Sequence, residues 1–162
     1  MIRFFTFLTL LFFITMAAAA ADKFSYLGHY WNEEKNGIFM LHMLDGNIEG
    51  TTVWGKNPSK DVNNPDLSLR DRPLSGIKFL WGFTYDAKKN RWVDGKVYDP
   101  NNGKTYSAKM SLENDGYTLK MRGYIGVALF GRTAKFERVN SEDMPDGMTG
   151  EMVETAAEEL NR

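Results

Sequence analysis

Residues 104–125 read KTYSAKMSLENDGYTLKMRGYI, and this stretch decides the fold. Apolar residues alternate with polar ones in two runs, first Tyr106, Ala108, Met110 and Leu112, then Leu119, Met121 and Ile125. A period of two is typical of a β-strand with one buried face. Asp115-Gly116 lies between the runs and tolerates the positive φ angles of a tight turn. The stretch therefore predicts two antiparallel strands, with Met110 facing inward and Lys109 facing outward.

Similar signals lie on both sides of this hairpin. The run Ile38–Leu44 is apolar on both faces, and Asp45-Gly46 marks a turn into Ile48–Trp54. The other predicted strands are Ile77–Tyr85, Arg91–Tyr98 and Arg132–Arg138, with reversals at Lys88–Asn90 and Asp99–Gly103. About seven or eight short strands without a helical pattern between them predict an all-β fold. We expect an antiparallel calycin- or lipocalin-like barrel that is closed or nearly closed.

One long loop interrupts the series of strands. From Gly55 to Pro73, lysine, asparagine, aspartate, serine and three prolines dominate, and no apolar period survives. Unstructured connections longer than about 12 to 15 residues are uncommon in compact domains. This loop is therefore either mobile or a candidate for function.

Residues 1–21 have the pattern of an export signal. Arg3 supplies a positive start, Phe4–Met16 is an apolar run interrupted only by threonines, and Ala17–Ala21 offers small residues for cleavage. We predict secretion with cleavage at Ala21 and no stable membrane span afterwards. An uncleaved membrane anchor is the alternative, because the apolar stretch approaches the roughly 18 residues at which a span becomes possible.

Composition excludes several classes of site. The chain of 162 residues has a net charge of −1, and the leader holds one basic residue and no acidic one, so the processed chain has a net charge of −2. This balance gives no bulk attraction to nucleic acid or to an anionic bilayer. The absence of cysteine excludes disulfides, thiolate metal sites and a lipid-attachment cysteine.

Three regions follow from these patterns: a signal peptide at 1–21, one β-barrel domain at 22–140 and an acidic tail at 141–162. In the tail, apolar residues recur at helical spacing between Met152 and Leu160 with glutamates on the other side. This pattern predicts a short C-terminal amphipathic helix. It would pack on the barrel rim or fray, or alternatively bind a partner.

No catalytic or cofactor motif is found in the chain. Gly103–Thr105 lacks the first glycine of a phosphate-binding loop and joins two strands, and Asp99–Gly103 lacks the closing glutamate of a calcium loop. The two histidines, His29 and His42, have no further ligand at helical or hairpin spacing. We therefore expect no metal, no cofactor and no enzyme activity.

Aromatic and arginine residues are the candidates for ligand binding. Aromatic side chains occur on nearly every predicted strand, and they suit either a dry core or the lining of an apolar cavity. Arginines in the turn-rich segments suit either the plain surface or a cluster that holds a carboxylate or phosphate at the barrel mouth. The candidate binding residues are Arg70, Arg72, Trp81, Trp92, Tyr98, Tyr106, Arg122, Tyr124 and Arg132.

Six sequence blocks follow one another along the chain: NPD at 64–66, RDRPLSG at 70–76, Trp92 with Gly95, YDPNNGKTYSAKM at 98–110, RGYIG at 122–126 and FGRT at 130–133. Together they resemble domain-of-unknown-function family 2147, from about Gly28 to Arg138. The resemblance implies a small exported bacterial protein of a Gram-negative periplasm, and it supplies no catalytic residues. It also implies that RDRPLSG and YDPNNGKTY belong to the family pattern, and loop residues held by a family are more often functional than packing residues.

Two functions of different classes remain open. The first is a periplasmic binding module whose barrel takes a small apolar or amphipathic molecule and whose long loop covers one mouth. The second is an envelope interaction protein with a solid β core, which contacts a protein partner through the long loop or the acidic helix. A hydrolase of envelope glycan or lipid is the remote third, with Asp94 and Asp99 as its candidate acids.

Overall fold

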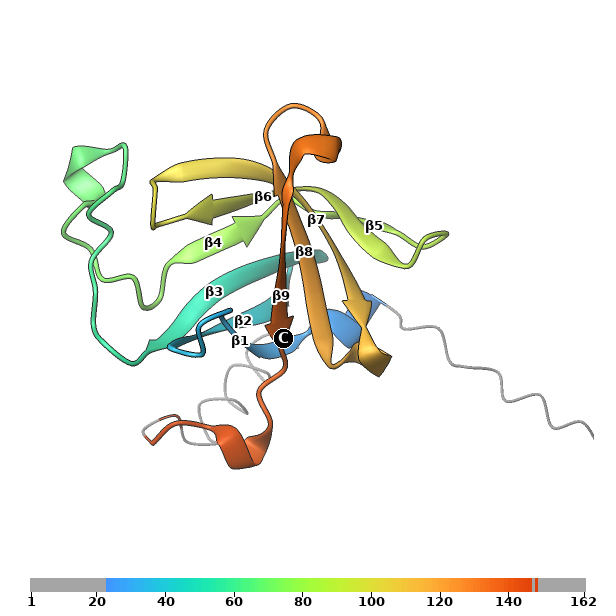
Figure 1. Cartoon of the computed structure of the whole chain (residues 1–162), viewed down its shortest axis with the longest axis horizontal. Coiled ribbons are helices and arrows are strands. Elements are labelled where there is room, and N and C mark those ends of the chain that lie inside the picture. Colours follow the sequence, from blue (N-terminus) through green and yellow to red (C-terminus); the bar gives the residue numbers. More distant parts are fainter. Residues whose placement is uncertain (1–22, 147, 149–162) are drawn as a thin grey trace, which may run out of the picture.

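The computed structural model describes residues 23–146 and Met148, and it folds them into one antiparallel sheet that curls into a barrel (Figure 1). The strands are β1 (Gly28–Trp31), β2 (Gly37–Leu44), β3 (Asn47–Gly55), β4 (Lys78–Trp81), β5 (Thr84–Asp86), β6 (Arg91–Asp99), β7 (Lys104–Glu113), β8 (Thr118–Tyr124) and β9 (Arg132–Glu137). Short 3₁₀ segments are η1 (Lys23–Tyr26), η2 (Leu67–Leu69), η3 (Asn114–Gly116), η4 (Ala128–Phe130) and η5 (Ser141–Asp143). The predicted all-β class is confirmed.

The sheet is nearly closed into a ring. Its strands follow the order β1-β2-β3-β4-β6-β7-β8-β9, and β5 pairs with β6 outside this path. Eight strands therefore form the barrel wall, in agreement with the predicted number. A bridge between Tyr30 and Arg138 completes the ring, next to a hydrogen bond of 2.9 Å from the Val139 N–H to the His29 carbonyl.

The stretch that decides the fold forms the β7–β8 hairpin. Met110 pairs with Met121 and Lys109 with Arg122, so inward and outward positions alternate as predicted. The prediction for Ile125 is wrong, because β8 ends at Tyr124 and Ile125 lies exposed in the following loop. The pairing of β8 with β9 ends at Gly123 and its pairing with β7 ends at Tyr124, so no partner strand continues alongside Ile125.

The two other predicted turns show what glycine contributes. Asp45 and Gly46 both have positive φ, 49° and 78°, as the type I′ turn of the β2–β3 hairpin requires. The predicted strand Ile77–Tyr85 is in fact two strands. Gly82, with φ of 73°, breaks the run between β4 and β5. The alternation of apolar residues in the sequence continues through this break, because a period of two carries no information about a change of backbone direction.

The end of the barrel near η1 is filled with apolar side chains, and we call it the closed end. Its buried residues include Tyr26, Tyr30, Leu41, Ile48, Leu80, Phe83, Trp92, Met110, Leu119 and Met121. Tyr26 lies edge-on to Trp92, with ring centroids 6.4 Å apart. A Cβ on Gly95 would lie 2.2 Å from the ring of Phe83, so this position requires glycine. The closed end is therefore a solid core.

A smaller cluster lies on the outer side of β1, β2 and β3. Val139 and Met148 bury Ile38 there, and half-buried residues including Trp31 and Trp54 pack around them. The beginning of the acidic tail therefore packs against the barrel wall. The predicted signal peptide at 1–21 and the predicted helix between Met152 and Leu160 lie outside the described residues.

Candidate functional site

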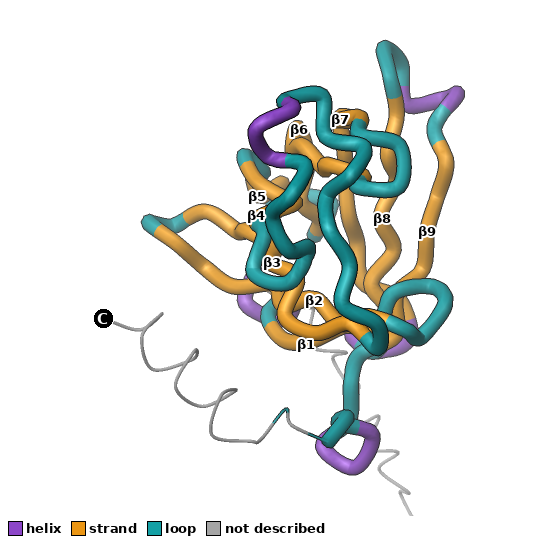
Figure 2. The backbone as a smooth tube through the Cα atoms, turned by 90° about the vertical axis from the view of Figure 1, so that its left-hand side faces the viewer, coloured by secondary structure: helices purple, strands orange, loops and turns teal. Residues whose placement is uncertain are grey.

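Four connections gather at the other end of the barrel, which we call the loop end. Every second connection of an antiparallel barrel returns to the same end. The four are the β1–β2 turn (32–36), the long loop (56–77), the β6–β7 turn (100–103) and the β8–β9 loop (125–131). Figure 2 shows the molecule with the long loop in the foreground. The blocks RDRPLSG and YDPNNGKTY both lie at this end.

Inward-facing residues of β6 and β7 are only half buried at the loop end. Val97 pairs with the fully buried Leu80 on one side and with Tyr106 on the other, so all three share the inner face. A Cβ on Gly123 of β8 would lie 3.7 Å from the Tyr106 Cβ and 3.9 Å from the Val97 Cγ1. Val97 and Tyr106 nevertheless keep part of their surface exposed.

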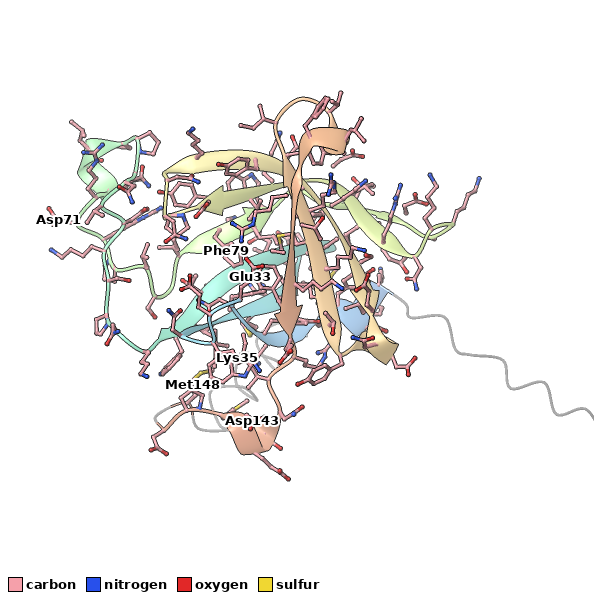
Figure 3. The ribbon with its side chains drawn as sticks, viewed as in Figure 1. Glu33, Lys35, Asp71, Phe79, Asp143 and Met148 are labelled. Carbon is pink, nitrogen blue, oxygen red and sulfur yellow. The ribbon has the colours of Figure 1, made fainter. Side chains whose placement is uncertain are left out.

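Two phenylalanines extend this half-buried surface. Phe79 and Phe136 pack edge-on against the buried Phe39, with ring centroids 5.2 Å and 5.1 Å away. Both are only partly buried, and Figure 3 labels Phe79 next to β4. The inner face of the barrel is therefore incompletely covered at the loop end.

A buried carboxylate organises the long loop. Asp61 is 0 % exposed, and its oxygens accept hydrogen bonds from the Tyr98 hydroxyl (2.5 Å), the Asn64 amide (2.7 Å) and the Nε and Nη2 of Arg72 (3.0 and 2.8 Å). Burial of a charge is costly unless the charge is paired and hydrogen-bonded, and Asp61 meets both conditions. Because Tyr98 belongs to β6, this network ties the loop to the barrel wall.

The same contacts fix the protonation states of the network. Burial raises the pKa of Asp61, but the hydrogen bonds from Tyr98, Asn64 and Arg72 outweigh burial and leave that pKa below its usual value. Burial, together with the Asp61 carboxylate, raises the pKa of the Tyr98 phenol to about 12. At neutral pH an ionised carboxylate therefore accepts from a neutral phenol and a guanidinium. The partners of this carboxylate all come from the protein, so its role is to hold the loop.

The long loop is also fixed to the β6–β7 turn. The Asn63 amide donates to the carbonyls of Pro100 (3.1 Å) and Asn101 (3.0 Å). Gly103 has φ of 69°, and a Cβ at this position would lie 1.9 Å from the Asn63 carbonyl oxygen. The long loop was predicted to be either mobile or a candidate for function. These contacts argue against mobility, because they hold the loop in place at the loop end.

The predicted aromatic candidates fall into different places. Trp92 is part of the core at the closed end, and Tyr98 belongs to the Asp61 network. Trp81 and Tyr124 pair with outward-facing residues of β6 and β7 and are half buried. Among the five, Tyr106 is the one that the register places on the accessible part of the inner face, and its hydroxyl accepts from the Asn102 amide (3.0 Å).

The predicted arginine candidates have separate sets of partners. Arg70 Nε donates to the Asn64 carbonyl (2.8 Å), and Arg72 binds Asp61. Arg122 bonds to residues of the β8–β9 loop, and Arg132 Nη2 lies 3.0 Å from Glu33 Oε2. The structure therefore does not gather the four into one cluster. Arg132 alternates with Ala134 and Phe136 along β9, which places it on the inner side at the loop end.

Sequence reasoning missed Asp61, Phe79 and Val97, and it treated the β8–β9 loop as a continuation of a strand. A single aspartate in a polar loop carries no signal of burial, because one of its partners, Tyr98, comes from a distant strand. Phe79 lies next to the inward-facing Leu80, at a register shift between β3 and β4 that the sequence does not reveal. The alternation that places Val97 inward does not tell the two ends of a barrel apart. Among the described residues, no group of three or more His, Asp or Glu side chains is placed to hold a metal ion. None of the helices in this part of the chain is long and apolar enough to cross a membrane.

Comparison with known proteins supports the barrel and identifies the family. Protein HP1028 from Helicobacter pylori, described as belonging to the lipocalin family, superposes with a TM-score of 0.65 at 22 % sequence identity over 80 % of this chain and 97 % of that one. At this identity the likeness shows the fold. No curated protein matches the sequence. The model of a family described as "Uncharacterized protein conserved in bacteria (DUF2147)" matches residues 28–138, and because this is more than half of the chain, the protein belongs to that family.

Proposed function

We propose that this protein is a binding module that takes a small apolar or amphipathic molecule at the loop end of its barrel. The observation that carries this proposal is the contrast between the two ends of the inner face. The core at the closed end consists of fully buried side chains with partly buried residues such as Met43 and Leu112 at its border, whereas Phe79, Val97 and Tyr106 at the loop end are only partly buried. Small barrels of lipocalin type hold one ligand at such a mouth.

The residues at the loop end suggest how the ligand is oriented. Phe79 and Val97 would contact its apolar part. Arg132, on the inner side of β9 and 84 % exposed, would pair with an acidic head group in exchange for Glu33. A guanidinium binds a carboxylate or phosphate through two parallel hydrogen bonds, so an amphipathic anion fits this arrangement better than a neutral hydrocarbon.

The proposed compartment is the periplasm, and the proposed activity is binding without catalysis. The leader pattern of residues 1–21 and the absence of cysteine agree with an exported protein that needs no disulfide. Cell fractionation with detection of the processed chain tests the compartment. The envelope interaction module remains the second candidate function, and the observation that favours it is the fully packed core of the closed end.

Titration with dodecanoate tests the binding function. Displacement of the fluorescent probe 1-anilinonaphthalene-8-sulfonate reports the binding. Gly123→Leu places a side chain between Tyr106 and Val97 and should weaken dodecanoate binding about tenfold or more, because it fills the mouth. Thr105→Leu adds a similar side chain at an exposed position on the outer side of β7, and it should bind like the wild type. Failure of the wild-type protein to bind, or equal binding by both variants, would overturn the proposal.

A further inference from the structure

The β8–β9 loop exposes a concentrated apolar surface. Ile125, Val127, Leu129 and Phe130 are 69, 60, 79 and 82 % exposed. Single exposed apolar residues are ordinary, but four large ones within six positions form a patch, and such patches mark interaction sites. The loop projects from the barrel at the top of Figure 1.

Arg122 holds the loop in this projecting shape. Its Nε donates to the Ala128 carbonyl (2.7 Å), its Nη2 to the Leu129 carbonyl (2.9 Å) and its Nη1 to the Thr133 hydroxyl (2.8 Å). The Phe130 N–H also donates back to the carbonyl of residue 127. Part of the loop backbone is therefore already hydrogen-bonded, which lowers the cost of moving the loop out of water.

A basic hollow lies beside the loop, on the outer side of β7, β8 and β9. Its volume is about 360 Å³, its lining includes Arg91, Lys109, Lys120 and Arg122, and no acidic residue lines it. Lys109 lies directly opposite Arg122, an arrangement of like charges that destabilises a strand pair. The Lys109 side chain has no hydrogen-bond or ion-pair partner among residues 23–146. The described chain therefore leaves the positive charge of the hollow uncompensated at this position.

A neighbouring pair on the same sheet shows how the protein compensates such repulsion elsewhere. Lys120 and Lys135 also lie opposite each other, and both bind Glu113 at 2.8 Å. The two lysines lower the pKa of Glu113 to about 2. An internal carboxylate thus offsets part of the charge of this pair, whereas no carboxylate of the described residues binds Lys109 or Arg122.

We propose that this face docks on a bilayer that contains anionic phospholipid. The β8–β9 loop would enter the boundary between head groups and acyl chains, and the basic hollow would contact a lipid phosphate. Apolar side chains beside basic ones are the combination by which proteins lie on a membrane surface. Arg122 belongs to both parts, because it lines the hollow and fixes the loop.

Charge supports a lipid surface over a general electrostatic attraction. The chain as a whole has a net charge of −1, so the basic residues of the hollow are a local concentration and not a consequence of composition. A free phosphate would use the hollow but leave the apolar loop unexplained. This inference does not depend on the proposed ligand of the barrel, because neither Phe79 nor Val97 takes part in it.

Vesicle co-sedimentation tests the inference. The protein is exported and processed in an expression host, its N-terminus is verified by mass spectrometry, and it is mixed with vesicles of phosphatidylcholine alone or in equal parts with phosphatidylglycerol. Two variants probe the two parts of the surface, the double variant Leu129→Ser/Phe130→Ser and the single variant Lys109→Glu. Leu44→Ser and Lys88→Glu are the matched controls, because both alter exposed positions on turns at the closed end.

We expect the wild type to bind the mixed vesicles more strongly than phosphatidylcholine alone. The loop variant and Lys109→Glu should each lower the partition coefficient about tenfold or more, and both controls should leave it unchanged. Lys109→Glu should unfold at no lower temperature than the wild type, because the introduced carboxylate would face Arg122, so lost binding is not lost folding. Absent vesicle binding, or binding that both variants retain, would overturn the inference. Binding of inorganic phosphate without vesicle binding would overturn it as well and assign the hollow to a free anion.

Discussion

At the scale of the residue, Asp61 is the position on which the long loop depends most. Asp61→Ala leaves the Tyr98 hydroxyl and the Arg72 guanidinium without their acceptor, so we expect the free energy of unfolding to fall by about 2 to 3 kcal/mol. Asp71→Ala in the same loop removes only an exposed ion pair with Lys60 and should leave the free energy of unfolding nearly unchanged. Urea denaturation measures both, and similar losses would contradict the buried role of Asp61.

Glu113 determines how the stability of the protein changes with pH in the acid range. Its pKa is about 2 in the folded state against 4.5 ordinarily, because Lys120 and Lys135 bind its carboxylate. The unfolded chain therefore binds more protons between these values, so the stabilisation is complete above about pH 4.5 and disappears as the pH falls towards 2. Glu113→Gln should flatten this part of the profile of melting temperature against pH. If the melting temperature of the variant fell with decreasing pH as it does in the wild type, Glu113 would not contribute to this dependence.

At the scale of the element, the attachment of the long loop to the β6–β7 turn depends on Gly103. Gly103→Ala adds both a strained positive φ and a contact with the Asn63 carbonyl, so the loop must move away from the turn. Gly46→Ala is the control, because it has positive φ but open space around it and should cost only about 1 kcal/mol. Limited proteolysis within 56–77 should accelerate in Gly103→Ala alone; equal rates in both variants would argue against the attachment.

The β7–β8 hairpin allows a direct test of register. Met110 is 1 % exposed on the inner face, so Met110→Asp buries an unpaired carboxylate and should cost several kcal/mol, about 3 or more. Lys109→Asp faces Arg122 on the outer side and should preserve stability. Circular dichroism during thermal unfolding measures both variants. Comparable tolerance at the two positions would refute the register.

Sequence reasoning was accurate for elements whose signal is local. The alternation around Met110 and the Asp45-Gly46 turn are decided by neighbouring residues, and the structure confirms both. The break at Gly82 and the end of β8 depend on which strand lies alongside, and this information is not local. The site depended on distant partners still more. Asp61 becomes visible only when β6 supplies Tyr98, and the difference between the two ends of the inner face follows from how η1 and the loops close the barrel.

At the scale of the whole molecule, Arg138 closes the barrel. Its guanidinium donates to the Gly116 carbonyl at 3.2 Å and to three further acceptors at 2.7 Å each, the carbonyls of Ser25 and Leu27 and the Tyr30 hydroxyl. Arg138→Lys keeps the charge but cannot reach all of these acceptors, so we expect a loss of about 2 kcal/mol in the free energy of unfolding. Arg132→Lys, which changes an exposed ion pair, is the control and should have little effect. Equal unfolding midpoints for the two variants would exclude this role of Arg138.

The packed core at the closed end limits how deeply a ligand can enter the barrel. On β7, Tyr106 is accessible, whereas Ala108, the next inward residue, is 0 % exposed. Two residues of a strand advance about 7 Å, so the accessible section is shallow. Only the end of a long acyl chain would fit into this section, and the rest of the chain would remain exposed to solvent. Such a shallow section predicts fast dissociation of a bound ligand.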